Sequence, residues 1–177
     1  RLQLGLPPFQ QKPMIRTQED LLQVIDQFSF PEVFREIISG SIPEGLSGIC
    51  DPPLEFSYPI FFRHPEAFPE PGQLLILWDT NQSSITGFLM DDQIFIKSYL
   101  EDGPEVDSVI ADNYQQFACH ILRQYFNSFS SVETAGLLAQ RFEFKYWEEM
   151  LQVYSEAAHH PIGELTKQLD LFSASLK

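Results

Sequence analysis

Apolar residues recur along the chain at two spacings, which predict a mixture of helices and strands. A spacing of three and four residues places side chains on one helical face. It predicts helices within 17–27, 31–38, 112–127, 130–142, 144–158 and 165–176. Short apolar runs and alternating patterns predict strands at 74–78, 84–90 and 93–99. The predicted fold class is therefore α+β, an antiparallel β-meander flanked by helices.

Capping signals indicate where several of these helices begin and end. Thr17 with Asp20, and Ser29 with Glu32, have the spacing of a capping box, in which two side chains satisfy free amides of the first turn. Gly40 is a predicted left-handed helix stop. The same kind of start is predicted for two later helices, at Asp112 and Ser130.

The 177 residues have the length of one ordinary domain, and we interpret residues 1–177 as such. Residues 1–16 hold two adjacent prolines and no apolar periodicity, which predicts an extended N-terminal arm. Residues 41–72 form a proline-rich insertion in which only 54–62 has the composition of a strand, and Pro59 makes it an edge or bulged strand. Residues 128–177 are expected to add C-terminal helices.

The chain carries 25 acidic and 11 basic residues, a net charge of -14. This charge opposes both phosphate backbones and anionic lipids, so we expect neither nucleic acid nor a membrane as partner. It favours either simple solubility or steering toward a basic protein. The apolar runs are strand-sized, and Cys50 and Cys119 fit no metal or disulfide spacing, so a cytoplasmic location is expected.

The sequence contains no pattern typical of catalysis or metal binding. His159 and His160 are adjacent, so on a helix they point apart and cannot hold one ion together. Cys119 and His120 diverge for the same reason, and a buried, inert thiol is the expectation for Cys119. We therefore expect no catalytic residues, no metal, no cofactor and no enzyme. An enzyme whose carboxylates meet only in the fold remains the exception.

The carboxylates of the central stretch are interpreted as turns and surface. Asp91 and Asp92 are predicted as a two-residue hairpin loop, and EDGPEVD at 101–107 as a solvated loop around a Gly-Pro turn. The alternative prediction is that these residues form one acidic rim together with Asp112, which would speed encounter with a cationic partner. Trp78 and Tyr99 are the expected aromatic anchors, with core packing as their alternative. The expected partner-binding residues are Trp78, Asp79, Asp91, Asp92, Tyr99, Glu101, Asp102, Glu105 and Asp107.

The order of these segments resembles the SMI1/KNR4 (SUKH) superfamily over residues 17–127. The segments that carry the resemblance are FPEVFREIIS, LLILWDTNQSSITGFL, QIFIKSYL and YQQFACHILRQYF. Pro31, Trp78, Asp79, Gly87 and Phe117 stand at the family's pattern positions. The chain departs from the pattern in having Ser39-Gly40 in place of Asn-Gly, a longer segment 41–72 and a longer tail after Ser128.

The resemblance implies an α+β fold without catalysis that binds another protein, often as an immunity protein against a toxin. We therefore expect an immunity-like inhibitor that occludes a basic partner such as a toxin. The alternative is a small-molecule-binding or regulatory sensor domain, with an apolar pocket between the sheet and the helices.

Overall fold

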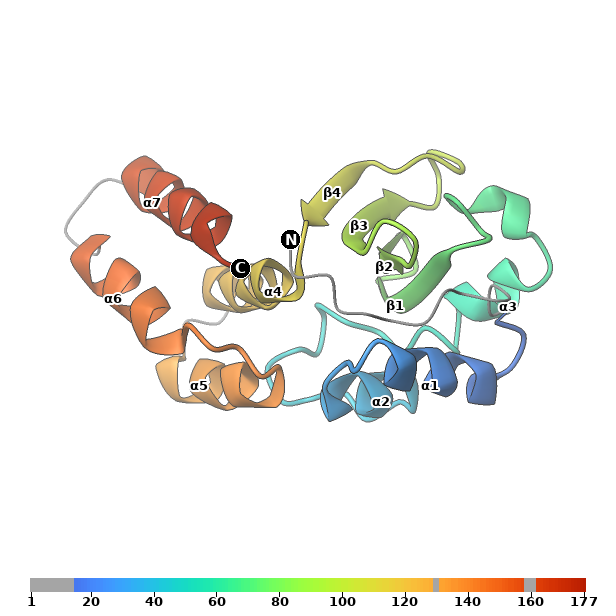
Figure 1. The fold of residues 1–177 in the computed structure, drawn as a ribbon, viewed down its shortest axis with the longest axis horizontal. Coiled ribbons are helices and arrows are strands. Elements are labelled where there is room, and N and C mark those ends of the chain that lie inside the picture. Colours follow the sequence, from blue (N-terminus) through green and yellow to red (C-terminus); the bar gives the residue numbers. More distant parts are fainter. Residues whose placement is uncertain (1–14, 129–130, 158–161) are drawn as a thin grey trace.

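The computed structural model describes residues 15–128, 131–157 and 162–177. One long helix, α4, lies between a four-stranded sheet and a group of C-terminal helices (Figure 1). The helices are α1 (Gln18–Gln27), α2 (Glu32–Ile38), α3 (Ser57–Phe61), α4 (Tyr114–Ser128), α5 (Val132–Arg141), α6 (Trp147–Ala157) and α7 (Ile162–Ser175), with a 3₁₀ turn at Pro65–Ala67. The strands are β1 (Leu74–Thr80), β2 (Ser84–Leu89), β3 (Ile94–Tyr99) and β4 (Ser108–Ala111). The predicted α+β class is confirmed. Residues 1–14 of the predicted arm lie outside the described residues.

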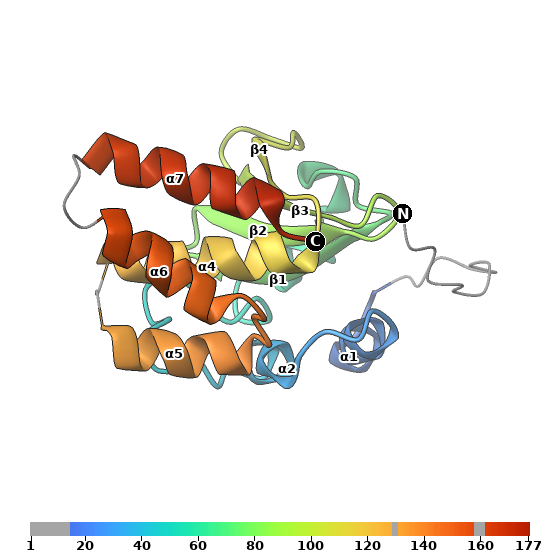
Figure 2. The ribbon, with the colours of Figure 1, turned by 60° about the vertical axis from the view of Figure 1, so that its left-hand side comes forward.

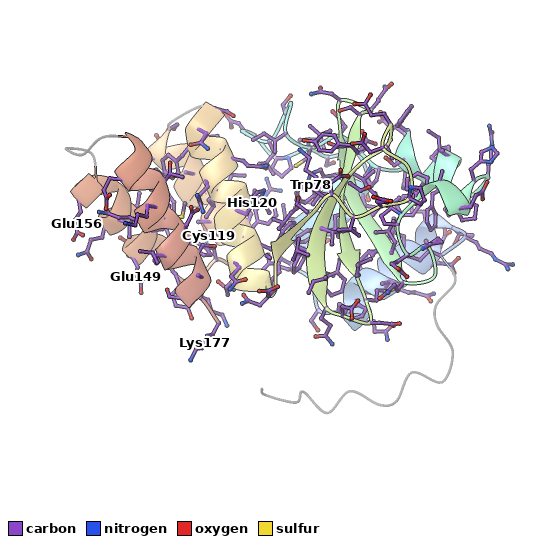
Figure 3. The ribbon with its side chains drawn as sticks, turned by 90° about the horizontal axis from the view of Figure 1, so that it is seen from above. Trp78, Cys119, His120, Glu149, Glu156 and Lys177 are labelled. Atoms are coloured by element: carbon purple, nitrogen blue, oxygen red, sulfur yellow. The ribbon has the colours of Figure 1, made fainter. Side chains whose placement is uncertain are left out.

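The sheet is the predicted antiparallel meander, with strand order β1-β2-β3-β4. It lies between α4 on one side and α3 on the other (Figures 1 and 3). Because both faces are covered, every residue of β2 is buried, including the residues that its alternating pattern would otherwise expose. Trp78 of β1 is opposite Thr86 of β2, which in turn is opposite Lys97 of β3, so these three side chains form a row on one face.

Aromatic rings fill the space between the sheet and the helices. The rings of Phe95 and Phe117 are stacked with centroids 4.0 Å apart, and Trp78 stacks on Phe117 at 5.5 Å. Phe34 of α2 completes the cluster against Trp78 at 6.3 Å. These four residues are at most 2% exposed, so they anchor both α2 and α4 to the sheet.

The predicted capping signals of the first two helices are partly confirmed. Thr17 and Asp20 form the capping box of α1, and Gly40, with φ +89°, ends α2. The predicted box of Ser29 and Glu32 is wrong, because Ser29 has φ +54° and ends α1 instead of beginning α2. The amide of Ser29 donates to the Asp26 carbonyl, a bond typical of a left-handed helix end.

Two later helix starts lie one residue beyond their predicted positions. The Asn113 side chain, rather than that of Asp112, accepts a hydrogen bond from the Gln116 amide at the start of α4. Ser131 caps α5 by accepting from the Thr134 amide, while the predicted cap Ser130 lies outside the described residues.

The strand predicted at 54–62 is wrong, because this stretch forms the short helix α3. Pro59 is its third residue, where the first helical turn leaves an amide without a partner and tolerates proline. The proline-rich segment covers the outer edge of β1. The fully buried Tyr58 hydroxyl accepts from the Ile76 amide at 3.0 Å and donates to its carbonyl at 3.2 Å, and Asp51 forms a backbone bridge with Asp79. An edge strand that would otherwise expose unpaired backbone is thereby closed.

The turns of the meander also differ from prediction. Leu89 pairs with Ile94, so the β2–β3 loop has four residues, 90–93, and its left-handed residue is Gln93 at φ +54°. The predicted two-residue turn at Asp91 and Asp92 is therefore wrong, although both residues are exposed as expected. Strand β4 had no clear sequence signal.

The C-terminal helices predicted in 128–177 are confirmed as α5, α6 and α7. Helices α6 and α7 lie beside each other, on the side of α4 away from the sheet (Figures 1 and 2). Phe126 of α4 contacts α6 through the rings of Trp147 at 5.9 Å and Tyr154 at 4.6 Å. None of the helices in the described parts of the chain combines the length and apolar character needed to cross a bilayer.

Candidate functional site

The acidic residues of the meander lie at two opposite ends of the sheet. The β1–β2 turn and the β3–β4 loop are at one end, whereas the β2–β3 loop and the start of α4 are at the other. Strands of six residues hold the two ends about 20 Å apart. The single acidic rim predicted from the sequence is therefore wrong, because Asp91, Asp92 and Asp112 are separated from the 101–107 loop.

The first of these ends carries the larger group of carboxylates, which we call the acidic end. Backbone and side-chain hydrogen bonds connect its loops: the Leu100 amide donates to the Ser83 carbonyl at 2.9 Å, and the Asn81 amide donates to the Asp51 carboxylate at 2.8 Å. The acidic end consists of Asp51, Glu55, Glu101, Asp102, Glu105 and Asp107. All of these are exposed except Asp51, which is half-buried.

The β3–β4 loop is held in one conformation by its own hydrogen bonds. The Asp107 carboxylate accepts from the Tyr99 amide at 2.6 Å, and the Ser98 hydroxyl donates to the Glu105 carbonyl at 2.7 Å. Gly103 takes φ +89° between them. Since the loop is already ordered, a partner that binds it loses less conformational entropy than one that must order it.

The two predicted aromatic anchors differ in exposure. Tyr99 is 38% exposed beside the acidic end, and the Lys97 ammonium lies 4.7 Å from its ring centroid. Trp78 is only 2% exposed, because Phe34 and Phe117 cover its ring. The expectation that Trp78 contacts a partner is therefore wrong, and its core-packing alternative holds.

Asp79 is not the wet turn residue that the sequence predicted. Strand β1 continues through Thr80, so Asp79 lies inside the strand and is 1% exposed. One carboxylate oxygen, Oδ2, accepts from the Ser57 hydroxyl at 3.0 Å, while Oδ1 has no hydrogen-bond partner among the described residues. Burial raises the pKa of the Asp79 carboxyl, the Ser57 hydrogen bond lowers it, and the charge of Asp51 raises it again.

A hollow of about 500 Å³ opens beside Asp79 and Asp51. Its lining residues are Asp51, Pro52, Glu55, Phe56, Asp79, Asn81 and Gln82. Within residues 15–128, 131–157 and 162–177, no group of three or more His, Cys, Asp or Glu side chains is arranged to hold a metal ion. The Ser57–Asp79 pair has no histidine in this lining to act as a base, so we interpret it as a link between α3 and β1.

The position of Asp79 predicts a pH-dependent effect of Asp79→Asn. A carboxyl whose pKa is raised on folding stabilises the folded state below its unfolded pKa, and this stability is lost as pH rises through the folded pKa. The asparagine cannot ionise, so the variant should gain stability relative to the wild type between about pH 3 and about pH 6, where carboxyls titrate. Urea denaturation across this range measures it, with the exposed Asp92→Asn as matched control. A relative loss of stability with rising pH would show that the fold favours ionised Asp79.

Both cysteines are buried, which confirms the expectation for Cys119. Burial raises the pKa of the Cys119 thiol to about 11, and burial also raises the pKa of Cys50. Figure 3 shows Cys119 on the side of α4 toward the C-terminal helices and His120 on the side that faces the sheet. His159 and His160 lie outside the described residues.

Sequence reasoning missed one group of residues, a set of polar side chains between α4 and the sheet that includes Lys97 and His120. Polar residues of α4 recur at positions 116, 120, 123, 124 and 127, a stripe that would ordinarily face water. The signal is visible in the sequence, but only the fold shows that this stripe faces strands.

Comparison with protein-family models, with curated proteins and with solved structures finds no match for this chain.

Proposed function

We propose that this chain binds a basic protein through the acidic end and blocks that protein's working surface, as an immunity-like inhibitor does. The observation that carries the proposal is the gathering of carboxylates on ordered loops at one end of the sheet. The resemblance to the SUKH superfamily points in the same direction.

Electrostatics favours a cationic partner for this surface. The chain as a whole carries a net charge of -14, to which the carboxylates of the acidic end contribute. The resulting electric field extends well beyond single side chains and speeds the encounter with a basic protein. Salt screens this attraction, with a Debye length of about 10 Å at 0.1 M and about 3 Å at 1 M. Binding through the acidic end should therefore weaken in high salt.

Tyr99 supplies the apolar part of the proposed contact. An exposed tyrosine adds a large, rigid contact area to a charged surface, and such residues carry much of the binding energy in interfaces. The partner's active cleft would be occluded by the loops around Tyr99, without any chemical step in this chain.

Charge reversal at the two ends of the sheet tests the proposal. The double variant Glu101→Lys with Asp102→Lys changes the acidic end, and Asp91→Lys with Asp92→Lys makes the same change in net charge at the opposite end. We expect the first to weaken capture of the partner from native host cells about tenfold, and the second to leave it within about twofold. Capture is measured by pull-down at about 0.1 M and about 1 M salt.

Two results would contradict the proposal. Equal losses in both double variants would show that overall charge, not the acidic end, governs binding. Failure to capture any protein in a salt-dependent manner would remove the inhibitor function itself.

A further inference from the structure

A polar cavity lies between the sheet and α4, on the opposite face of β1 from the hollow beside Asp79. We call it the sheet–helix cavity, and its volume is about 260 Å³. It is lined by Gly48, Ile49, Trp78, Thr80, Thr86, Lys97, Ile110, His120, Gln124, Asn127 and Ser128. A second hollow of about 510 Å³ between α4 and α7 shares Ile110, His120, Gln124 and Asn127 with it, which places His120 where the two spaces meet. In Figure 3, His120 on α4 lies across from Trp78 on the strands.

Two elements supply the polar groups of the cavity. The sheet contributes Thr86 and Lys97, which are opposite each other on β2 and β3, while α4 contributes His120, Gln124 and Asn127 at positions i, i+4 and i+7. Residues at this spacing share one helical face. Polar side chains from a strand row and a helix face therefore converge on one space, with Thr86 buried, Lys97, His120 and Gln124 half-buried and Asn127 exposed.

These groups have almost no partners in the part of the protein that the structure describes. Among the described residues, no hydrogen bond or ion pair is made by the side chains of Thr86, His120, Gln124 or Asn127, and Lys97 contacts only the Tyr99 ring. The Thr80 hydroxyl is the exception, donating to the Ile49 carbonyl at 2.8 Å. Their polar atoms are open to the cavity instead of being paired with described residues, and convergent polar groups in a recess are typical of a ligand site.

The charge of the cavity is opposite to that of the protein. Of the described residues that line it, none is acidic, although the chain has 25 acidic residues. Lys97 is its one formal charge. Asp112, Arg123 and Asp170 line the outer hollow, where Arg123 and Asp170 form an ion pair at 2.7 Å and so largely neutralise each other.

His120 is neutral at physiological pH in this setting. Burial, together with the positive charges of Arg123 and Lys97, lowers its pKa to about 4. A neutral imidazole offers one donor and one acceptor beside the Lys97 ammonium. An anion bound between the imidazole and the ammonium would raise the pKa of His120, because a nearby negative charge favours the protonated ring.

We propose that the sheet–helix cavity binds a small organic anion through a carboxylate or phosphate group, with Lys97 as the charged contact and His120, Thr86, Gln124 and Asn127 as hydrogen-bond partners. A small ligand fits better than an acidic macromolecule, because the cavity is recessed and the chain as a whole carries a net charge of -14, which repels a large anion. At about 0.15 M salt, charges more than about 8 Å away are screened, so the nearby lysine outweighs the distant carboxylates. The cavity adjoins the acidic end through the contact of Lys97 with the Tyr99 ring, but its ligand is a small anion and not the basic protein proposed there.

The test follows His120 by NMR while the full chain is titrated with inorganic phosphate or with malonate at constant ionic strength. His120→Gln assigns the signal. Saturable shifts of the His120 ring signal with either anion are expected, and the stronger of the two identifies the preferred group. The bound anion should also raise the midpoint of the His120 titration from about 4 to above about 5.

Matched variants separate the site from general charge. Lys97→Met keeps the aliphatic stem, removes the ammonium, and should weaken anion binding at least tenfold. Lys145→Met makes the same charge change on an exposed lysine outside the cavity and should leave binding within about twofold. Lys97→Gln serves as a second variant if Lys97→Met does not fold. The proposal is overturned if neither anion shifts His120 saturably, or if the folded Lys97 variant binds as tightly as the wild type.

Discussion

Replacing Gly45 with alanine should lower the free energy of unfolding by about 3 kcal/mol, through two effects that add. Gly45 has φ +89°, a conformation that costs an L-residue about 1 kcal/mol or more. A Cβ at this position would lie 2.7 Å from the Tyr125 ring and 3.0 Å from the Thr134 methyl group. Tyr125 is buried in α4, so the ring has little space to move, and overpacking of this kind costs about 1–3 kcal/mol.

Gly40 provides the matched control. It has the same φ of +89°, but no atom of the described residues lies within 4 Å of the position its Cβ would occupy. Gly40→Ala should therefore show the backbone cost alone, about 1 kcal/mol. Urea denaturation of both variants measures the difference. Equal destabilisation would mean that the loop around Gly45 moves away from α4 and α5 without cost.

Replacing Tyr58 with phenylalanine should cost about 2–4 kcal/mol, although only one oxygen is removed. That oxygen satisfies both the amide and the carbonyl of Ile76 on the outer edge of β1. Tyr58 and Ile76 are both fully buried, so water cannot replace the hydroxyl, and each orphaned backbone group costs about 1–3 kcal/mol.

Amide hydrogen exchange gives a local readout for this prediction. The Ile76 amide should exchange faster in Tyr58→Phe than the loss of global stability alone explains, because its hydrogen bond is gone. The control is Tyr146→Phe, whose hydroxyl makes no hydrogen bond within the described residues, and it should change stability by less than about 0.5 kcal/mol. Unchanged protection of Ile76 would show that β1 does not need this edge contact.

The candidate sites illustrate which properties depend on distant parts of the chain. The exposure of the 101–107 loop follows from its composition, and it is confirmed. The burial of Asp79 cannot be read from its neighbours in the sequence, because the Ser57 hydroxyl that contacts it comes from a helix 22 residues earlier. In the same way, Lys97 and His120 look unremarkable in the sequence, and only the packing of α4 over the strand row places them in one cavity.

The sequence by itself determined the local structure of this protein. Helical spacing located the helices other than α3, alternation located three strands of the meander, and Thr17 and Gly40 marked helix ends, because each signal depends on neighbours within a few residues. Only the tertiary structure decided that α3 closes the β1 edge, that the acidic residues divide between two ends of the sheet, and that the polar stripe of α4 faces a cavity. The physical reason is that burial, pairing and electrostatic surroundings depend on residues far apart in the chain, which meet only when the sheet and the helices pack together.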